Sequence, residues 1–215
     1  MNSGFLSLFA AVFLISPHAL SMACKNLYLH SEPRLIILSA PSGGGKTSLV
    51  KRFLTDHKSE FVQSVSVTTR APRPGEVSGI DYNFVSIADF RAKLATSEFL
   101  EHAEVHGNYY GTSKTQIDQA LADGKSVFLL IDVSGAHRIK KIYGPKAQLI
   151  FIRPPDLHTL EQRLRGRNTD SEEVIQRRLR NAVHELSFES QFEKVVINDN
   201  FEKAYADLID AVYKP

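Results

Sequence analysis

The sequence predicts an α/β fold with a core of parallel strands and helices on both faces. An apolar run at residues 35–38 leads into a glycine-rich loop and then into a segment with helical apolar spacing. Two further apolar runs, at 126–131 and 148–152, are continuous enough to be strands buried on both faces. Segments of helical spacing follow them, and this alternation is typical of a parallel sheet. With 215 residues, of which 43% are hydrophobic, the chain is long enough for one such core.

The glycine-rich loop has the composition of a phosphate-binding loop, Ser39-Ala40-Pro41-Ser42-Gly43-Gly44-Gly45-Lys46-Thr47-Ser48. Small residues let consecutive backbone N–H groups converge on an anion, and the following helix adds its unpaired first-turn N–H groups and its positive dipole end. We expect Lys46 to reach the β- and γ-phosphates, and the Thr47 hydroxyl to complete the coordination of a hydrated Mg²⁺. The full P-loop pattern begins with Gly, whereas this chain has Ala40, which then needs an ordinary backbone conformation. The alternative, a flexible turn with a surface lysine, is disfavoured by the strand before the loop and the helix after it.

Charge and cysteine content limit the partners and the compartment. The net charge of +2 and the lack of a dense basic block give no indication of a nucleic-acid partner. Cys24 is the single cysteine, so the chain cannot form an intrachain disulfide, and this fits a reducing, cytoplasmic location.

The first thirty residues differ from the rest of the chain. Residues 1–23 contain no Lys, Arg, Asp or Glu, and the apolar run at 5–15 is similar to the core of a signal peptide. The run has no positively charged segment before it and is too short to span a bilayer as a helix. We therefore expect residues 1–30 to be an extension outside the core or a misassigned start, with Met22 as the alternative start, and we expect no membrane partner. Export is the less favoured interpretation.

After the loop, residues 61–69 predict a strand that runs into a loop with two arginines, Arg70 and Arg73. Pro72 and Pro74 prevent a helix there, so both guanidinium groups are expected to be available to an anion. Arginine binds phosphate bidentately. A solvated basic loop is the alternative that these residues alone leave open.

The next segments predict a small β-rich insert. We expect a short strand in 79–85, a helix over 87–94, a strand over 99–105 and a hairpin turn in 107–112. Residue chemistry alone indicates that this insert binds a phosphorylated molecule.

The second half continues the alternation of strands and helices. A helix over 115–121 ends near Gly124, and a strand over 126–132 brings the carboxylate of Asp132 to the edge of the phosphate site. The later elements are expected, in order, as a strand at 148–152, a helix at 156–167, a helix from 171 to about 189, a strand at 195–198 and a closing helix from 201. The arginine-rich junction between the two longer helices indicates a lid, because arginines that arrive on closure stabilise a transferring phosphoryl group. The second of these helices should turn inward Val174, Ile175, Leu179, Val183 and Leu186.

Five short segments occur in one order, Ser39-Ala40-Pro41-Ser42-Gly43, Ser64-Val65-Ser66-Val67-Thr68-Thr69-Arg70, Pro74-Gly75-Glu76, Asp81-Tyr82-Asn83-Phe84 and Gly107-Asn108-Tyr109-Tyr110-Gly111. Through them the chain from residue 33 onward resembles guanylate kinases, enzymes that phosphorylate GMP with ATP. The resemblance implies a P-loop kinase fold over 33–215, with an inserted β-rich GMP-binding subdomain at 65–115 and a helical lid at 156–178. It also implies direct transfer of the γ-phosphoryl group of ATP to GMP, giving ADP and GDP in purine nucleotide metabolism, with Mg²⁺ as cofactor.

The resemblance, together with the loop chemistry, assigns roles to individual residues. ATP would be held by Ala40, Pro41, Ser42, Gly43, Gly44, Gly45, Lys46, Thr47, Ser48 and Asn198, with Thr47 also binding the metal. GMP would be held by Ser66, Arg70, Arg73, Tyr82, Glu101, Tyr110, Thr112 and Asp132. The catalytic groups would be Lys46, Arg163, Arg167, Arg178 and Asp132. Ordinary ion-paired or solvated positions are expected for Arg165, Arg177 and Arg180, beside Glu172, Glu173 and Glu185.

Glu101 would make the site selective for guanine. Guanine presents N1–H and N2–H₂ as adjacent donors and O6 as an acceptor, so the carboxylate accepts from both donors while a hydroxyl of Ser66 or Thr112 donates to O6. Adenine would place an acceptor at N1 against the carboxylate, and a mispaired buried charge is strongly unfavourable.

Two departures from the family pattern and two alternative functions stay open. Leu130 stands where a second acid is common, and Asn168 stands where Gly is common. A kinase of the same fold could act on another phosphorylated acceptor, such as a ribose bisphosphate, but Glu101 would then have no guanine edge to contact. A non-catalytic module that binds phosphorylated peptides would not need the complete loop and the lid arginines. Whether the protein is a monomer or a homodimer, and whether it accepts dGMP, is left open.

Overall fold

The computed structural model describes residues 32–105, 107–166 and 170–214. The elements below belong to the compact unit that begins at residue 33. Within the described ranges, no helix combines the length and the apolar character that a membrane span needs. Outside these ranges lie the expectations for residues 1–30, Met22, Cys24, Arg167 and Asn168.

The core is a five-stranded parallel sheet, as predicted. In spatial order its strands are β2 (Phe61–Gln63), β7 (Ser126–Leu130), β1 (Leu35–Ser39), β8 (Ala147–Arg153) and β9 (Lys194–Ile197). β1 lies at the centre and all of its residues are buried, which explains its unbroken apolar run. Because neighbouring strands are parallel, the segments after β1 and β7 leave the sheet at the same edge, where the glycine loop and Asp132 lie.

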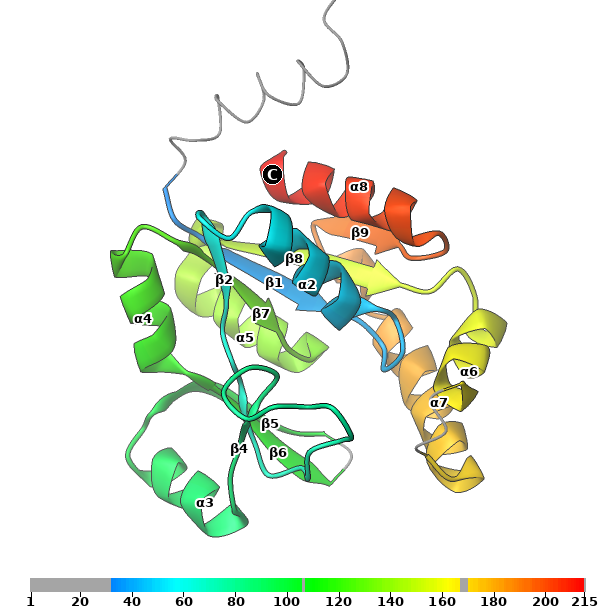
Figure 1. Ribbon diagram of the computed structural model, residues 1–215, viewed down its shortest axis with the longest axis horizontal. Coiled ribbons are helices and arrows are strands. Elements are labelled where there is room, and N and C mark those ends of the chain that lie inside the picture. Colours follow the sequence, from blue (N-terminus) through cyan, green and yellow to red (C-terminus); the bar gives the residue numbers. More distant parts are fainter. Residues whose placement is uncertain (1–31, 106, 167–169, 215) are drawn as a thin grey trace, which may run out of the picture. The chain divides into compact units, whose positions relative to one another are not determined.

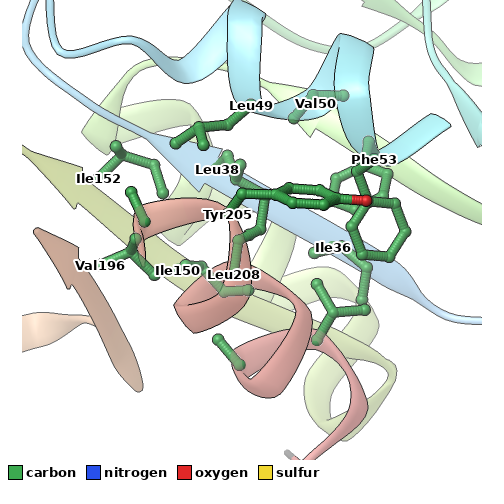
Figure 2. Close-up of a cluster of buried hydrophobic side chains, with 14 of the residues drawn as sticks. Ile36, Leu38, Leu49, Val50, Phe53, Ile150, Ile152, Val196, Tyr205 and Leu208 are labelled. Carbon is green, nitrogen blue, oxygen red and sulfur yellow. The ribbon is translucent and has the colours of Figure 1, made fainter. Parts of the chain in front are cut away.

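Helices cover both faces of this sheet (Figure 1). One face is covered by α2 (Lys46–Asp56) and α8 (Phe201–Tyr213), and the other by α4 (Lys114–Ala122) and α5 (Val133–Tyr143). Figure 2 shows the first face, where Phe53 of α2 and Tyr205 of α8 lie among the apolar side chains of β1 and β8. Burying a side chain such as that of Phe53 contributes roughly 1.5–3 kcal/mol. This packing anchors α2, the helix that carries Lys46 at its start.

A second, four-stranded sheet forms the predicted insert. In spatial order its strands are β4 (Asn83–Phe84), β3 (Val67–Thr68), β6 (Asn108–Ser113) and β5 (Phe99–Val105), and the chain joins β4 to β5 through α3 (Ile87–Ala95). β5 and β6 form a hairpin, but the prediction that its turn spans 107–112 is wrong: the chain turns at Gly107, with a left-handed φ of 79°, and Asn108–Ser113 form the strand β6. Phe90 of α3 packs against Phe99 of β5 with ring centroids 4.7 Å apart, so the helix is anchored on this sheet.

The prediction of one strand over 61–69 is wrong. The first part, β2, pairs with β7 in the core sheet, whereas β3 pairs with β4 and β6 in the insert. The Ser64 N–H donates to Phe128 O (3.0 Å) and the Asn83 N–H donates to Ser66 O (2.8 Å), so the backbone changes partners between the two sheets. Apolar alternation indicates which side chains are buried, but not the sheet to which a strand belongs. The alternation over 61–69 therefore continues from β2 into β3, although the two strands belong to different sheets.

The predicted lid segment contains the two expected helices, α6 (Leu157–Arg165) and α7 (Glu172–Leu186). They share an apolar cluster formed by Leu160, Leu164, Leu179, Ile175 and Ala182. Val183, which was predicted to point inward, is 54% exposed. Ala182 takes its place because it lies two helical turns after Ile175. α7 ends three residues earlier than predicted, and a short 3₁₀ turn follows at η2 (Glu189–Gln191).

The helix α5 was not among the predicted elements. Its buried residues Val133, Ala136 and Ile139 recur at a spacing that fits one helical face. The Asp132 carboxylate accepts a hydrogen bond from the Gly135 N–H (2.6 Å) and caps the helix. After α5 comes the 3₁₀ turn η1 (Gly144–Lys146). Asp132, which lies two residues after the end of β7, is therefore the N-cap of the helix that follows.

Candidate active site

The glycine loop joins β1 to α2 and leaves the first turn of that helix open. Gly43 and Gly45 have left-handed φ angles of 96° and 93°, which glycine adopts without strain. Gly45 is the N-cap of α2 and has no side chain to accept from the helix, whereas a Ser, Asp or Asn side chain caps each of the other six α-helices that the structure describes. The first-turn N–H groups of α2 therefore suit an anion. Ala40 does not have a positive φ, in agreement with the ordinary conformation expected there.

Asn198 supports the loop from the sheet side. Its buried side chain donates from Nδ2 to Gly44 O (2.8 Å), and its backbone oxygen accepts from Arg163 Nη2 (2.8 Å). A Cβ at Gly45 would lie 2.0 Å from Asn198 Nδ2, so a side chain larger than that of glycine does not fit at this position. The contact that the structure gives Asn198 is with the loop backbone, and its direct contact with ATP stays a prediction.

A cavity of about 270 Å³ lies beside the loop. Eleven of the predicted site residues line it, from the loop, the end of β7, the insert and α7: Ala40, Ser42, Lys46, Ser66, Arg70, Arg73, Tyr82, Glu101, Tyr110, Asp132 and Arg178. Leu130, which stands where an acid is common, also lines it, so this part of the wall is apolar. Residues far apart in the sequence, on both sheets and on α7, thus border a single space.

A carboxylate to which the sequence analysis gave no role, that of Glu76, holds the side chain of Arg70 and the backbone of Arg73. Arg70 Nη2 donates to both oxygens of Glu76 (2.8 and 2.9 Å), and Glu76 also accepts from the backbone N–H of Arg73 (2.7 Å). The Arg70 guanidinium lies 5.3 Å from the ring centroid of Tyr82. Arg70 is therefore fixed in place rather than free in solvent. Glu76 belongs to Pro74-Gly75-Glu76, one of the five segments that carry the family resemblance, and this segment could have indicated its role.

Glu101 lies on β5 with a buried carboxylate that two other elements hold. Thr112 Oγ1 donates to Oε1 (2.8 Å) from β6, and Arg138 Nη2 donates to Oε2 (3.0 Å) from α5. Burial raises the pKa of Glu101, the hydrogen bonds from Thr112 and Arg138 oppose the rise, and the nearby Asp132 adds to it. Thr112 is fully buried and reaches the cavity through Glu101. The sequence analysis missed Arg138 because it did not predict α5, although Val133, Ala136 and Ile139 recur at helical spacing.

Lys46 faces two carboxylates in the same cavity. Burial lowers the pKa of Lys46, and Glu185 and Asp132 counteract this shift. Burial raises the pKa of Glu185 to about 7 even though Lys46 opposes the rise, and Asp132 raises it further. Glu185 was expected beside the arginines of the lid helices, but it lines the cavity instead. Lys46, Glu185 and Asp132 thus influence one another's charge within this cavity.

The arginines of the lid helices have different environments. Arg178 donates from Nη1 to Ser42 Oγ of the loop (2.7 Å) and from Nη2 to Asp170 (3.2 Å), and so links α7 to the loop. Arg165 pairs with two glutamates, Glu161 and Glu172, as an ordinary ion-paired residue should. Arg177 was expected to be equally ordinary, yet it lines the cavity.

The residues at the start of α2 fit a hydrated Mg²⁺ bound with a nucleotide. Among the described residues, no three His, Cys, Asp or Glu side chains gather as a metal cage. Mg²⁺ keeps several waters and is usually held by one or two protein oxygens together with substrate phosphates. Thr47 supplies such an oxygen, since it lines a neighbouring cavity together with Ser42 and Lys46.

Comparisons with known proteins agree on one family. The family model described as "Guanylate kinase" matches residues 32–214. A guanylate kinase of Hydrogenovibrio crunogenus is 50% identical over 174 residues, which cover 81% of this chain and 84% of the relative. One of Salmonella paratyphi A is 50% identical over 179 residues, with 83% and 86% covered. The crystal structure of guanylate kinase from Anaplasma phagocytophilum superimposes with a TM-score of 0.68 at 30% identity, over 87% of this chain and 90% of that one.

Proposed function

The chain belongs to the guanylate kinase family, and on that premise we propose how its residues divide the transfer of the γ-phosphoryl group of ATP to GMP. The protein is a nucleoside monophosphate kinase whose substrates are nucleotides. One observation supports the assignment of residues most directly: Lys46 of the loop, Glu101 of the insert and Arg178 of α7 border the same cavity. Donor and acceptor can therefore meet there.

The ATP phosphates bind at the glycine loop. The open first turn of α2 offers backbone N–H groups, and Lys46 adds a point charge at the β- and γ-phosphates. Thr47 would hold the Mg²⁺ that accompanies ATP, and this ion would supply charge neutralisation on the phosphate oxygens. Asn198 fixes the loop through Gly44, and its predicted contact with ATP would add to this role.

GMP binds in the insert, over residues 65–115. Arg70, Arg73, Tyr82 and Tyr110 surround its phosphate, and Glu76 fixes the direction of the Arg70 guanidinium. Glu101 accepts from guanine N1–H and N2–H₂ while the Ser66 hydroxyl donates to O6, so GMP is preferred over AMP through polar groups rather than through size. Thr112, whose hydroxyl donates to Glu101, acts on guanine through that carboxylate.

Transfer is in line and direct, without a covalent enzyme intermediate. The GMP phosphate oxygen is already anionic, so no general base is needed, and the contribution of the chain is positioning and charge neutralisation. Lys46 and the arginines of residues 156–178, namely Arg163, Arg167 and Arg178, neutralise the transferring group, and Asp132 orients the acceptor end. A cytoplasmic location fits an enzyme that uses ATP.

The experiment is an ADP-release assay with Mg-ATP and GMP, dGMP, AMP, CMP or UMP, on wild type and on Lys46→Ala. We expect turnover with GMP and little with AMP or the pyrimidine nucleotides. K46A should lose turnover by about 10³-fold or more, since one preorganised charge at a transferring phosphoryl group contributes several kcal/mol. Calorimetry should show GMP binding to K46A with nearly unchanged affinity. GMP binding by wild type without any turnover would favour a binding module instead.

A further inference from the structure

Arg138 is the one cation in hydrogen-bond contact with Glu101 in the described part of the chain. A single nitrogen, Nη2, donates to Glu101 Oε2 (3.0 Å) and to the backbone oxygen of His102 (2.9 Å). The Arg138 side chain is 46% exposed, whereas that of Glu101 is 3% exposed. The cavity lining includes Glu101 but not Arg138. Arg138 thus contacts the carboxylate without bordering the space in which a nucleotide would lie.

We propose that Arg138 is a positioning residue for guanine selectivity, which keeps the Glu101 carboxylate ionised and in one orientation without touching the substrate. The inference rests on the proposed role of Glu101 as the acceptor for guanine. It also gives α5 a function, because Arg138 joins this helix of the core to β5 of the insert.

Acceptor counting supports this role. An ionised carboxylate has about four acceptor positions, two on each oxygen. Thr112 occupies one on Oε1 and Arg138 occupies one on Oε2, so one position per oxygen is left. Guanine offers two adjacent donors, N1–H and N2–H₂, and these match the two positions. Gly135 keeps the space beside Oε2 open, since a Cβ there would lie 2.7 Å from that oxygen.

The charge balance shows why a cation is needed. Burial and the nearby Asp132 both favour the neutral form of Glu101. A neutral acid would turn an O–H towards one of the guanine donors, and that mispairing in a buried site weakens binding. Arg138 opposes this from α5, and Thr112 opposes it from β6. The charged groups that line the cavity in front of Glu101 are Lys46, Arg70, Arg73, Asp132, Arg177, Arg178 and Glu185.

The test uses Arg138→Gln, which removes the charge but keeps a donor, and Arg138→Lys, which keeps the charge. Arg52→Gln is the matched control, because Arg52 also pairs with a carboxylate, Asp56, but on the surface of α2. KM for GMP, KM for ATP and kcat are measured from pH 6 to 8.5. The GMP phosphate titrates in this range for every variant, so the readout is the ratio of each variant to wild type.

Loss of the cation raises the pKa of Glu101, and the ionised form binds GMP, so the KM ratio should rise as pH falls. Because the partner is half exposed, we expect a KM for GMP roughly threefold above wild type at pH 6 in R138Q, and a smaller excess at pH 8.5. kcat at saturating GMP and KM for ATP should stay within about twofold. In R138K, the KM for GMP should return most of the way to the wild-type value, and R52Q should match wild type at every pH.

Glu101→Gln separates the two levels of inference. If E101Q raises KM for GMP and R138Q does not, the role of Arg138 is overturned while that of Glu101 stands. If E101Q leaves KM for GMP unchanged, the proposed guanine contact fails and the role of Arg138 fails with it. In the E101Q background, R138Q should have no further pH-dependent effect. A fall in kcat that is equal at all pH values, together with a lower melting temperature in both R138Q and R138K, would show a structural role only and overturn the inference.

Discussion

Replacing Gly45 by Ala should damage the phosphate loop in two separable ways. The residue has a φ of 93°, and a left-handed conformation costs a non-glycine residue roughly 1–2 kcal/mol. The new Cβ would lie 2.0 Å from Asn198 Nδ2, which must then move and give up its hydrogen bond to Gly44 O. A lost buried hydrogen bond costs about 1 kcal/mol. We therefore expect Gly45→Ala to lower the free energy of unfolding by about 2–3 kcal/mol.

Urea unfolding measures this loss, and Gly124→Ala is its control. Gly124 has a similar φ of 76°, but a Cβ there meets nothing within 4 Å, so only the backbone term of about 1–2 kcal/mol applies. In an Asn198→Ala background, the stability loss caused by G45A should shrink to the cost of the left-handed backbone alone, about 1–2 kcal/mol. ATP turnover gives the second readout: a loop displaced by about 1 Å should reduce kcat/KM for ATP by about 10²-fold in G45A, and G124A should leave it unchanged. Equal stability losses in G45A and G124A with normal ATP kinetics would refute the described loop geometry.

Two further predictions concern α7. Folding raises the pKa of Glu185 from 4.5 to about 7, so the folded state binds more protons than the unfolded state between these values, and this contribution to stability is lost as pH rises. Relative to Glu185→Gln, wild type should lose about 3 kcal/mol of unfolding free energy between pH 4.5 and 8, and parallel pH–stability curves for the two proteins would contradict the buried environment. Arg178→Ala should lower kcat by about 10²–10³-fold with little change in KM for GMP, since its charge acts on the transferring group. Ser42→Ala keeps that charge and should have a smaller effect, and the exposed Arg180→Ala should have none; equal losses in all three would rule out a specific role for Arg178.

Local patterns predicted the elements whose partners are close in sequence. The strand, glycine loop and helix around Lys46 are adjacent in the chain, and the hairpin of β5 and β6 turns at a glycine. The split of 61–69 between two sheets was not predictable in the same way, because the partners Phe128 and Asn83 are distant in sequence. Val183 shows the limit within a single helix, since a shift of one residue moves a side chain off the buried face.

Side-chain partners at the site were harder to predict than the site residues themselves. The family segments gave Glu101 and Arg70, but Arg138 is 37 residues from Glu101 and lies on a helix without a strong apolar run. Glu185 has the sequence context of a surface acid, with arginines nearby on the same helix. Only the packing of α7 over the loop brings it near Lys46. Which residue types are present is a property of the sequence, whereas the charge that each one carries depends on such contacts.

Glu101 and Glu185 show this dependence within one cavity. Burial raises the pKa of both. Glu101 has a direct ion pair with Arg138, which opposes this rise, whereas for Glu185 the charge of Lys46 opposes the rise and that of Asp132 adds to it. In the proposed assignment, Glu101 faces two N–H donors of guanine, where a full negative charge strengthens binding. Glu185 lies beside Lys46, at the end where the same assignment puts the phosphates, and a full negative charge there would oppose them. With its pKa raised to about 7, Glu185 changes charge near neutral pH, whereas the hydrogen bonds from Arg138 and Thr112 oppose protonation of Glu101.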